Sequence, residues 1–277
     1  MAPVVALLAS IAACGTASDA GGNFRLSADQ LNPATTTAPP VPVTTTATAN
    51  GEWLEVFAEK PTADPAVPSA TPASFAAATV QPIPRPGLGY EFAQTTFTGW
   101  TFKNPTYFGN PLVMVVTAIE GDWAKVSIPA RPNGQQGWVR VSDVSFGQHS
   151  FRAELILSQR LFTVWDGNTP LTQTNVVVGT EYSPTPVGTI YIGEKITAAA
   201  AGVNPGGSYG PWILSTSAYS ETLDQFDGGL PVIAFHGTNA PGLIGSAASN
   251  GCVRMPNEIV TLLAETIPAG TPVTVTP

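Results

Sequence analysis

Short stretches in which apolar and polar residues alternate dominate the middle of the chain. They lie at residues 112–116, 123–128 and 137–141, and a turn signal, Arg-Pro-Asn-Gly at 131–134, separates the last two. Alternation with a period of two residues is typical of half-buried strands, and short strands at this spacing are typical of small barrels. The pattern therefore predicts a small β-barrel module over residues 91–147.

The C-terminal part of the chain continues the strand-like pattern. Residues 153–165 predict a hairpin, and further strand-like runs follow at 174–178 and 191–193. The wholly apolar run 232–235 predicts a buried strand that ends at His236. The pattern alone therefore predicts a mainly β fold.

One helix is predicted near the C-terminus. Pro256 is a typical helix-start residue, and Gly270 is a typical residue just after a helix end. The apolar residues between them fall at helical spacing: Ile259, Leu262, Leu263 and Ile267. We therefore expect a single late helix.

Composition divides the chain further. The sequence has 27 prolines, 27 glycines and only 11% charged residues, which fits a β-rich secreted protein better than a helical cytosolic one. Residues 15–90 are rich in Thr, Pro and Ala and predict a tether, interrupted at 51–57 by a strand-like run that adds to the following sheet. The net charge of −8 and the lack of a basic patch exclude nucleic acid as an expected partner.

The first 13 residues are almost all apolar and end in Ala-Ala before Cys14. This pattern resembles a signal peptide with a lipobox over residues 1–14, in which Cys14 is lipidated; a plain signal peptide cleaved after the Ala-rich stretch is the alternative. No other stretch approaches the length of apolar sequence needed to cross a bilayer. We therefore expect a lipoprotein anchored to the membrane by its N-terminal lipid, with the rest of the chain on the extracytoplasmic, cell-wall or periplasmic side.

The chain has two cysteines and two histidines, and one of each lie close together. Cys252 follows His236 by 16 positions. A free thiol is only partly ionised at neutral pH, so cysteine catalysis generally needs an imidazole to take the proton. Both residues could instead be simple buried side chains, but a strand end and an Asn-Gly turn are places where reactive residues are found. The pair is therefore a candidate nucleophile with its base.

A metal site is the other chemistry open to a cysteine and a histidine. Zinc sites use three or four protein ligands, whereas this region offers one usable cysteine. The second histidine, His149, lies in the junction ahead of the C-terminal domain and is predicted to be a surface residue. We expect no metal and no other cofactor.

Four short motifs carry a family resemblance: Pro-Thr-Pro-Val-Gly at 184–188, Ser-Tyr-Gly-Pro at 208–211, His-Gly-Thr at 236–238 and Ser-Asn-Gly-Cys at 249–252. In this order they resemble the L,D-transpeptidases with a YkuD-type catalytic domain, here over residues 151–277. Asn250 stands where that fingerprint usually has a second histidine. The resemblance implies a β-sandwich catalytic domain with one late helix. The preceding module looks like a bacterial SH3-type barrel, either a wall-binding module or a rigid spacer.

The resemblance also implies the reaction. Cys252 would attack a peptidoglycan tetrapeptide stem, with His236 taking its proton, and release D-alanine. An amine of a second stem would then resolve the thioester and give a 3→3 cross-link in cell-wall biogenesis. Donor and acceptor stem peptides are thus the expected partners. A backbone carbonyl is the expected orienter of the imidazole, because Gly237 has no side chain.

The expected substrate-binding residues surround the nucleophile. The backbone amides of Gly251 and Cys252 are candidate donors to an oxyanion. Arg254 would hold a stem carboxylate or form an internal salt bridge, and Ser249 and Asn250 would donate to substrate or only shape the turn. Tyr209 and Tyr219 are further candidates for lining the pocket, with no catalytic task assigned.

Other functions remain open at this point. Water in place of the acceptor amine would make an L,D-carboxypeptidase, and a protein acceptor would make a protein-to-wall transpeptidase. A sortase-like transpeptidase also uses His, Cys and Arg in this order, but with a much longer His–Cys spacing. A non-enzymatic wall-binding lipoprotein with an inert Cys–His pair belongs to a different class.

Overall fold

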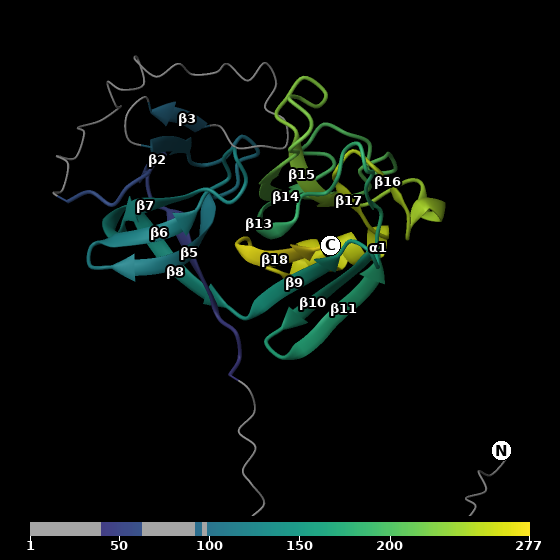
Figure 1. Ribbon diagram of the computed structural model, residues 1–277, viewed down its shortest axis with the longest axis horizontal. Helices are drawn as coiled ribbons and strands as arrows, with labels where there is room; N and C mark the ends of the chain where they lie inside the picture. The colour runs from purple at the N-terminus through teal and green to yellow at the C-terminus, as the bar shows by residue number, and fades with distance from the viewer. Residues whose placement is uncertain (1–39, 63–91, 96–98) are drawn as a thin grey trace, which may run out of the picture. The chain divides into compact units, whose positions relative to one another are not determined.

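Two eight-stranded sheets and one two-stranded sheet hold all the strands of the computed structural model, which describes residues 40–62, 92–95 and 99–277 (Figure 1). Side chains are described for all of these except 92–95. Every described strand lies in the unit Val41–Pro277. Among these residues the fold is mainly β with a single α-helix, as the sequence predicts. Cys14 and most of the predicted tether lie outside the described residues, and no described helix has the length and hydropathy of a membrane span.

The N-terminal sheet has the strand order β3-β4-β2-β7-β6-β5-β1-β8, with every pair antiparallel. Its strands are β1 (Thr44–Ala49), β2 (Trp53–Phe57), β3 (Phe92–Thr95), β4 (Gly99–Lys103), β5 (Val113–Glu120), β6 (Trp123–Ser127), β7 (Gln136–Arg140) and β8 (Val144–His149). The predicted strands at 112–116, 123–128 and 137–141 are confirmed as β5, β6 and β7. The SH3-type barrel stays a prediction.

Strands β1 and β2 fall inside the stretch for which composition predicts a tether. The run 51–57 does join the sheet as expected, but β1 also does, although its sequence is Thr-Thr-Thr-Ala-Thr-Ala. β1 pairs with β5 on one side and β8 on the other, which buries Ala47 and Ala49. Threonine has a β-branched side chain that fits a strand, so the same residues suit both a linker and a paired strand. The tether prediction is therefore wrong for residues 44–49.

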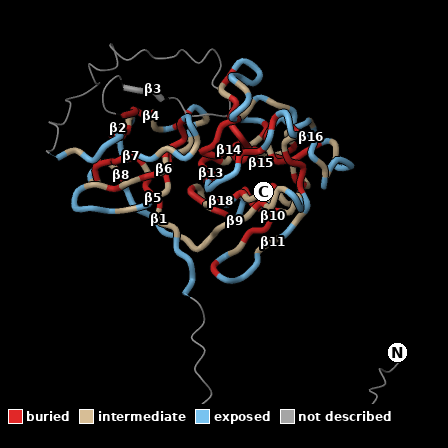
Figure 2. Tube along the Cα trace, in the orientation of Figure 1, coloured by how far each residue is buried: buried red, intermediate tan, exposed pale blue. Residues whose placement is uncertain are grey.

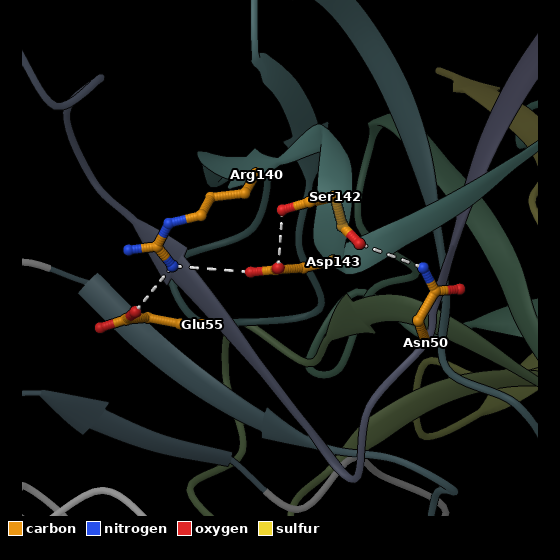
Figure 3. A network of polar contacts seen from close by, with 5 residues as sticks. All are labelled: Asn50, Glu55, Arg140, Ser142 and Asp143. Atoms are coloured by element: carbon orange, nitrogen blue, oxygen red, sulfur yellow. Dashed lines mark hydrogen bonds and ion pairs between the residues drawn. The ribbon is translucent and has the colours of Figure 1, made fainter. Parts of the chain in front are cut away.

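A buried arginine ties this sheet together (Figure 3). The Nη1 of Arg140 lies 3.2 Å from a carboxylate oxygen of Glu55 and 3.5 Å from one of Asp143. Its guanidinium also lies over the rings of Phe57 and Trp123, at 5.1 and 5.5 Å from their centroids. Because β2, β7 and the 3-10 turn Val141–Asp143 all contribute, the charge is compensated inside the module.

The C-terminal sheet has the strand order β11-β10-β9-β18-β13-β14-β15-β17. Its strands are β9 (Phe151–Ile156), β10 (Leu161–Asp166), β11 (Thr169–Asn175), β13 (Gly188–Thr197), β14 (Trp212–Tyr219), β15 (Val232–His236), β17 (Val253–Arg254) and β18 (Thr271–Thr276). The two-stranded sheet pairs β12 (Val178–Gly179) with β16 (Ala247–Ser249), and a 3-10 turn spans Pro241–Leu243. The predicted hairpin is confirmed as β9 and β10, and the predicted buried strand as β15.

The helix α1 (Asn257–Thr266) confirms the predicted late helix, and Pro256 is its N-cap. Its packed face differs from the prediction. Val260, Leu263 and Ala264 are buried, whereas Leu262 is 37% exposed. Helical spacing alone does not say which of two adjacent leucines faces the sheet; here α1 packs on β14 and β15, and Leu263 is the one that turns inward.

Buried residues concentrate along β13, β14 and β15, as Figure 2 shows, and this places His236 at the end of one of the most buried strands. The prediction that His149 is a surface residue is wrong. Both of its ring nitrogens are buried, and burial lowers the pKa of the imidazole. β8 ends at His149, one residue before β9 begins, so the junction consists of paired strands; its residues 145–148 are exposed, whereas the His149 ring nitrogens are not.

Candidate functional site

The pairing of β15 with β17 brings His236 and Cys252 to one face of the C-terminal sheet. The two strands are parallel, with Phe235 opposite Val253 and His236 opposite Arg254. Since side chains alternate between faces, Phe235 and Val253 enter the main core while His236, Arg254 and the preceding Cys252 point the other way. The strand register therefore assembles the pair that the sequence predicts.

A pocket opens on this face. Cys252, His236 and Arg254 line it together with Asn250 and Tyr209. Its remaining wall comes from Ser208 and from the segment between β14 and β15, which contributes Leu223, Phe226, Pro231 and Val232. Of the two tyrosines singled out from the sequence, Tyr209 lines the pocket, whereas Tyr219 is fully buried and its hydroxyl donates to the Pro129 carbonyl at 2.8 Å.

His236 is held with one ring nitrogen free to act as a base. Its Nδ1 lies 2.7 Å from the carbonyl oxygen of Gly237. A carbonyl only accepts hydrogen bonds, so Nδ1 carries the proton and Nε2 has the free lone pair. The orienting group is therefore a backbone carbonyl, as expected from the sequence. The Tyr209 ring lies 4.8 Å from the imidazole, centroid to centroid.

Burial keeps the imidazole neutral. Desolvation lowers the pKa of His236 to about 4, and the positive charge of Arg254 acts in the same direction. The Gly237 hydrogen bond opposes the shift without cancelling it. At neutral pH the ring is therefore an unprotonated base.

The Cys252 side chain is also neutral. Burial raises the pKa of its thiol above the ordinary value, although the Ala234 backbone and the charge of Arg254 oppose the shift. The Sγ atom lies 3.8 Å from the Val232 carbonyl oxygen, to which the thiol donates. In this resting state the pair is a neutral thiol and a neutral imidazole, so the thiol would have to lose its proton before or during any reaction as a nucleophile.

The turn that carries Cys252 is built by buried hydroxyl groups. Gly251 has a φ of +108°, and a Cβ there would meet the Ile233 side chain at 2.9 Å. Ser249 donates to the Cys252 carbonyl at 2.5 Å and accepts from the Gly251 amide at 3.2 Å. Ser249 is 2% exposed and both of its bonds lie within the turn, so it shapes the turn rather than facing substrate.

The predicted amide donors differ in availability. The Gly251 amide is bonded to Ser249, whereas the Cys252 amide has no acceptor within the part of the chain that the structure describes. Asn250 is exposed at the pocket rim, where the amide side chain is accessible to a ligand. The Cys252 amide and the Asn250 side chain are thus the donors open to a bound molecule.

Thr185 is a site residue that sequence reasoning missed. Its hydroxyl donates to the Gly251 carbonyl at 2.8 Å and accepts from the Gly179 amide at 2.9 Å. Thr185 is 3% exposed. The Pro-Thr-Pro-Val-Gly motif therefore binds the turn before Cys252 across 66 residues of sequence.

We expect Thr185→Val to loosen this turn without unfolding the domain. The change keeps the side-chain shape but leaves a buried carbonyl and a buried amide without partners, at a cost of about 1–3 kcal/mol. Thermal denaturation should show a lower midpoint, and hydrogen exchange should quicken at Gly251 and Cys252 more than in β13. Thr185→Ser, which keeps the hydroxyl, is the matched control; equal exchange in the two variants would contradict the assignment.

Two glycines and Asn257 hold the other side of the site. Gly210 has a φ of +64°, and a Cβ there would lie 2.6 Å from the Cα of Gly237. The Oδ1 of Asn257, the first residue of α1, accepts from the Thr238 amide at 2.8 Å. The Tyr-Gly-Pro and His-Gly-Thr motifs thus pack backbone against backbone, which explains why both need glycine.

Arg254 is the unpaired charge of the pocket. No ion pair involves it among the described residues, and its buried Nε has no hydrogen-bond partner there. The internal salt bridge, one of the two alternatives drawn from the sequence, is absent from the described residues. A half-buried guanidinium without a counter-charge is suited to an anionic ligand. The described residues include no cluster of three His, Cys, Asp or Glu side chains that suits a metal ion.

These features define a mainly β protein with a pocket that presents a thiol, an imidazole and a guanidinium. Residues 151–275 match the family model for YkuD, described as the L,D-transpeptidase catalytic domain. This part of the chain is therefore similar to YkuD-type L,D-transpeptidase catalytic domains.

Individual relatives are also similar to this chain. The YkuD protein of Bacillus subtilis (strain 168) is 37% identical over 100 residues, which cover 36% of this chain and 50% of that protein. The YkuD protein of Bacillus licheniformis is 32% identical over 127 residues, 46% of this chain and 66% of that protein. The chain thus spans half to about two thirds of these relatives. L,D-transpeptidase 3 from Mycobacterium tuberculosis, in complex with a faropenem-derived adduct, has a TM-score of 0.39 at 15% identity, over 60% of this chain and 91% of that chain.

Proposed function

We propose that this chain is a peptidoglycan L,D-transpeptidase that forms 3→3 cross-links through a thioester on Cys252. The observation that carries the proposal is the pocket of the YkuD-type domain, which Cys252, His236 and Arg254 line together. The thiol and imidazole supply a nucleophile and its base, and the guanidinium supplies a counter-charge for a peptide carboxylate.

The first half-reaction transfers the donor stem to the enzyme. The Nε2 of His236 takes the thiol proton as the sulfur attacks the carbonyl carbon of the third stem residue. The Cys252 amide donates to the oxygen on which charge develops. The intermediate then collapses, the bond to D-alanine breaks, and the imidazolium gives its proton to the leaving amine. The product is a thioester between the stem and Cys252.

The second half-reaction resolves this thioester. The side-chain amine of the third residue in another stem attacks the thioester carbonyl, and His236 takes the proton released by that amine. The C–S bond breaks and the sulfur regains a proton, which restores the neutral pair. Attack by water instead would give an L,D-carboxypeptidase, and attack by a protein amine would give a protein-to-wall transpeptidase.

Arg254 is the residue that this proposal assigns to a substrate carboxylate. We expect Arg254→Gln to raise KM for a tetrapeptide stem by about tenfold or more, because a charged hydrogen-bonded contact contributes about 1.5–3 kcal/mol. The backbone bonds between Arg254 and Val177 should survive, because they do not involve the side chain. Steady-state kinetics of D-alanine release measure the effect, with Arg254→Lys as the control that keeps the charge. An unchanged KM in Arg254→Gln would remove this assignment.

The function is tested by product analysis of the full chain with a disaccharide tetrapeptide. D-alanine release, a stem dimer joined between third residues, and a transient mass increase on Cys252 are expected. A tripeptide stem, which has no D-alanine to lose, is the matched control and should neither acylate the enzyme nor act as donor.

Each other outcome identifies a different function. D-alanine release without dimer would indicate a carboxypeptidase, and a dimer only when a protein amine is supplied would indicate protein attachment. A folded chain that binds insoluble peptidoglycan but gives neither product would indicate a non-enzymatic wall-binding protein.

The proposal extends to where the chain acts. Peptidoglycan lies outside the cytoplasmic membrane, and a lipid on Cys14 would hold the catalytic domain near its substrate. Mass spectrometry of the membrane fraction tests the anchor: a lipid adduct on Cys14, lost in Cys14→Ala, is the expected result.

A further inference from the structure

The segment between β14 and β15, residues 220–231, is the least supported wall of the pocket. Every residue from 221 to 228 except Leu223 is exposed. Within the segment, Phe226 and Gly229 exchange backbone hydrogen bonds at 3.0 Å, and the Ser220 hydroxyl accepts from the Thr222 and Leu223 amides. Yet Leu223 and Phe226 from this segment line the pocket that holds Cys252. Something outside the segment must therefore fix its position.

The N-terminal module supplies that support through the turn between β6 and β7. The Asn133 side chain pairs with both backbone groups of Tyr219, the last residue of β14: its Nδ2 donates to the Tyr219 carbonyl and its Oδ1 accepts from the Tyr219 amide, each at 2.8 Å. A side-chain amide here takes the place of a neighbouring strand. The buried Tyr219 hydroxyl adds a third bond, to the Pro129 carbonyl.

Arg131 holds the first turn of the segment itself. Its Nη2 donates to the Ser220 carbonyl at 2.6 Å and to the Leu223 carbonyl at 2.5 Å, and its guanidinium lies 5.8 Å from the centroid of the Tyr219 ring. The Ser220 hydroxyl accepts from two amides of the same turn, those of Thr222 and Leu223. Arg131 thus binds two carbonyls of this turn, and Ser220 binds two of its amides. Leu223, which faces the pocket, carries one of the two carbonyls that Arg131 binds.

We propose that Arg131 and Asn133 are positioning residues, through which the N-terminal module sets the place of the 220–231 wall and hence the affinity for the donor stem. This inference rests on the proposed transpeptidase function. It gives the module a role in the site, in addition to any role as a spacer or a wall-binding module. Arg131 and Asn133 take no part in the proposed proton transfer or bond formation at Cys252 and His236.

The test compares the wild-type full chain with the double variant Arg131→Ala/Asn133→Ala. We expect amide hydrogen exchange in residues 220–229 to quicken while β13 and β14 keep their protection. KM for the tetrapeptide stem should rise about tenfold, because the side-chain hydrogen bonds that hold Tyr219, Ser220 and Leu223 are lost, while kcat stays within about twofold. Arg152→Ala is the matched control, because Arg152 also stacks on an aromatic ring, Trp165, but lies on β9, with three strands between it and β15.

Milder variants cover the case in which the double variant does not fold. Asn133→Asp keeps the size of the side chain but removes the N–H donor to the Tyr219 carbonyl. Arg131→Lys keeps the positive charge but loses the planar guanidinium group. Asn133→Asp should reproduce the faster exchange and higher KM in part, and Arg131→Lys should lie closer to wild type.

The proposal would be overturned by unchanged exchange in 220–229, or by faster exchange with an unchanged KM. A fall in kcat at constant KM would also overturn it, because it would place these residues in the chemical step. A wild-type chain without transpeptidase activity would contradict the proposed function alone. The contact between the module and residues 220–231 could still be tested, because the hydrogen-exchange comparison uses no substrate.

Discussion

Replacing Cys252 with alanine is expected to abolish D-alanine release and to prevent any covalent adduct with a carbapenem. The thiol is the only group in the pocket that the proposed mechanism uses to form a bond to substrate, so loss on the order of 10⁵-fold or more is expected, as for other nucleophile deletions. Intact-mass spectrometry of the full chain after incubation with the carbapenem shows the adduct directly, and product analysis with the tetrapeptide shows turnover.

The matched control is Cys252→Ser, which nearly keeps the size of the side chain but replaces the thiol with a hydroxyl, a group that is not readily ionised. It should fold like wild type and be nearly as inactive as the alanine variant. Both variants should still bind insoluble peptidoglycan if the N-terminal module is wall-binding. Residual D-alanine release by Cys252→Ala at the wild-type rate would exclude the thioester mechanism.

The elements that carry the reactive pair could be predicted from sequence because their signals are local. An apolar run predicts β15, an Asn-Gly step predicts the turn before Cys252, and a proline predicts the start of α1; all three are present. Sequence also gives the order of the motifs. It does not give the register of β15 against β17, which turns His236 and Cys252 toward one pocket.

The supporting residues could not be predicted, because their contacts join parts of the chain that are distant in sequence. Thr185 holds Gly251 from 66 residues away, and Asn133 holds Tyr219 from 86 residues away. Thr185 lies in a motif that the family resemblance marks without explaining. Asn133 lies in a turn signal that predicts a hairpin and nothing more. In both cases the side chain satisfies backbone groups that only the folded chain brings near.

The protonation state of the pair also depends on the fold. From sequence, an imidazole near a thiol is compatible with either a neutral pair or a thiolate–imidazolium pair. The structure favours the neutral pair, because burial raises the pKa of Cys252 and lowers that of His236 to about 4. Arg254 stabilises the thiolate but opposes the imidazolium, so it does not favour the ion pair as a whole. In the proposed reaction, His236 therefore takes the thiol proton while Cys252 attacks the substrate, rather than beforehand.

This leads to the second large effect, expected for His236→Gln. Removal of the base should lower the rate of Cys252 acylation at neutral pH by about 10²–10⁴-fold, the usual contribution of general base catalysis. Glutamine keeps a polar side chain at the end of β15, and the bonds of Gly237 and Met255 to neighbouring backbone groups do not involve the imidazole. The acylation rate with a carbapenem, followed by intact mass, measures the effect.

The pH dependence of the acylation rate distinguishes attack by a neutral thiol assisted by His236 from attack by a thiolate without a base. In wild type the base is neutral above about pH 4, so the acylation rate should stay nearly constant from pH 5 to pH 8 rather than fall through the ordinary histidine value of 6.5. In His236→Gln only the thiolate reacts, and because its pKa is raised the rate should climb about tenfold per pH unit across the same range. A wild-type rate that follows the same slope would mean that His236 takes no proton. A wild-type rate that falls between pH 7 and pH 6 would mean that the imidazole is more exposed to water than its place at the end of β15 implies.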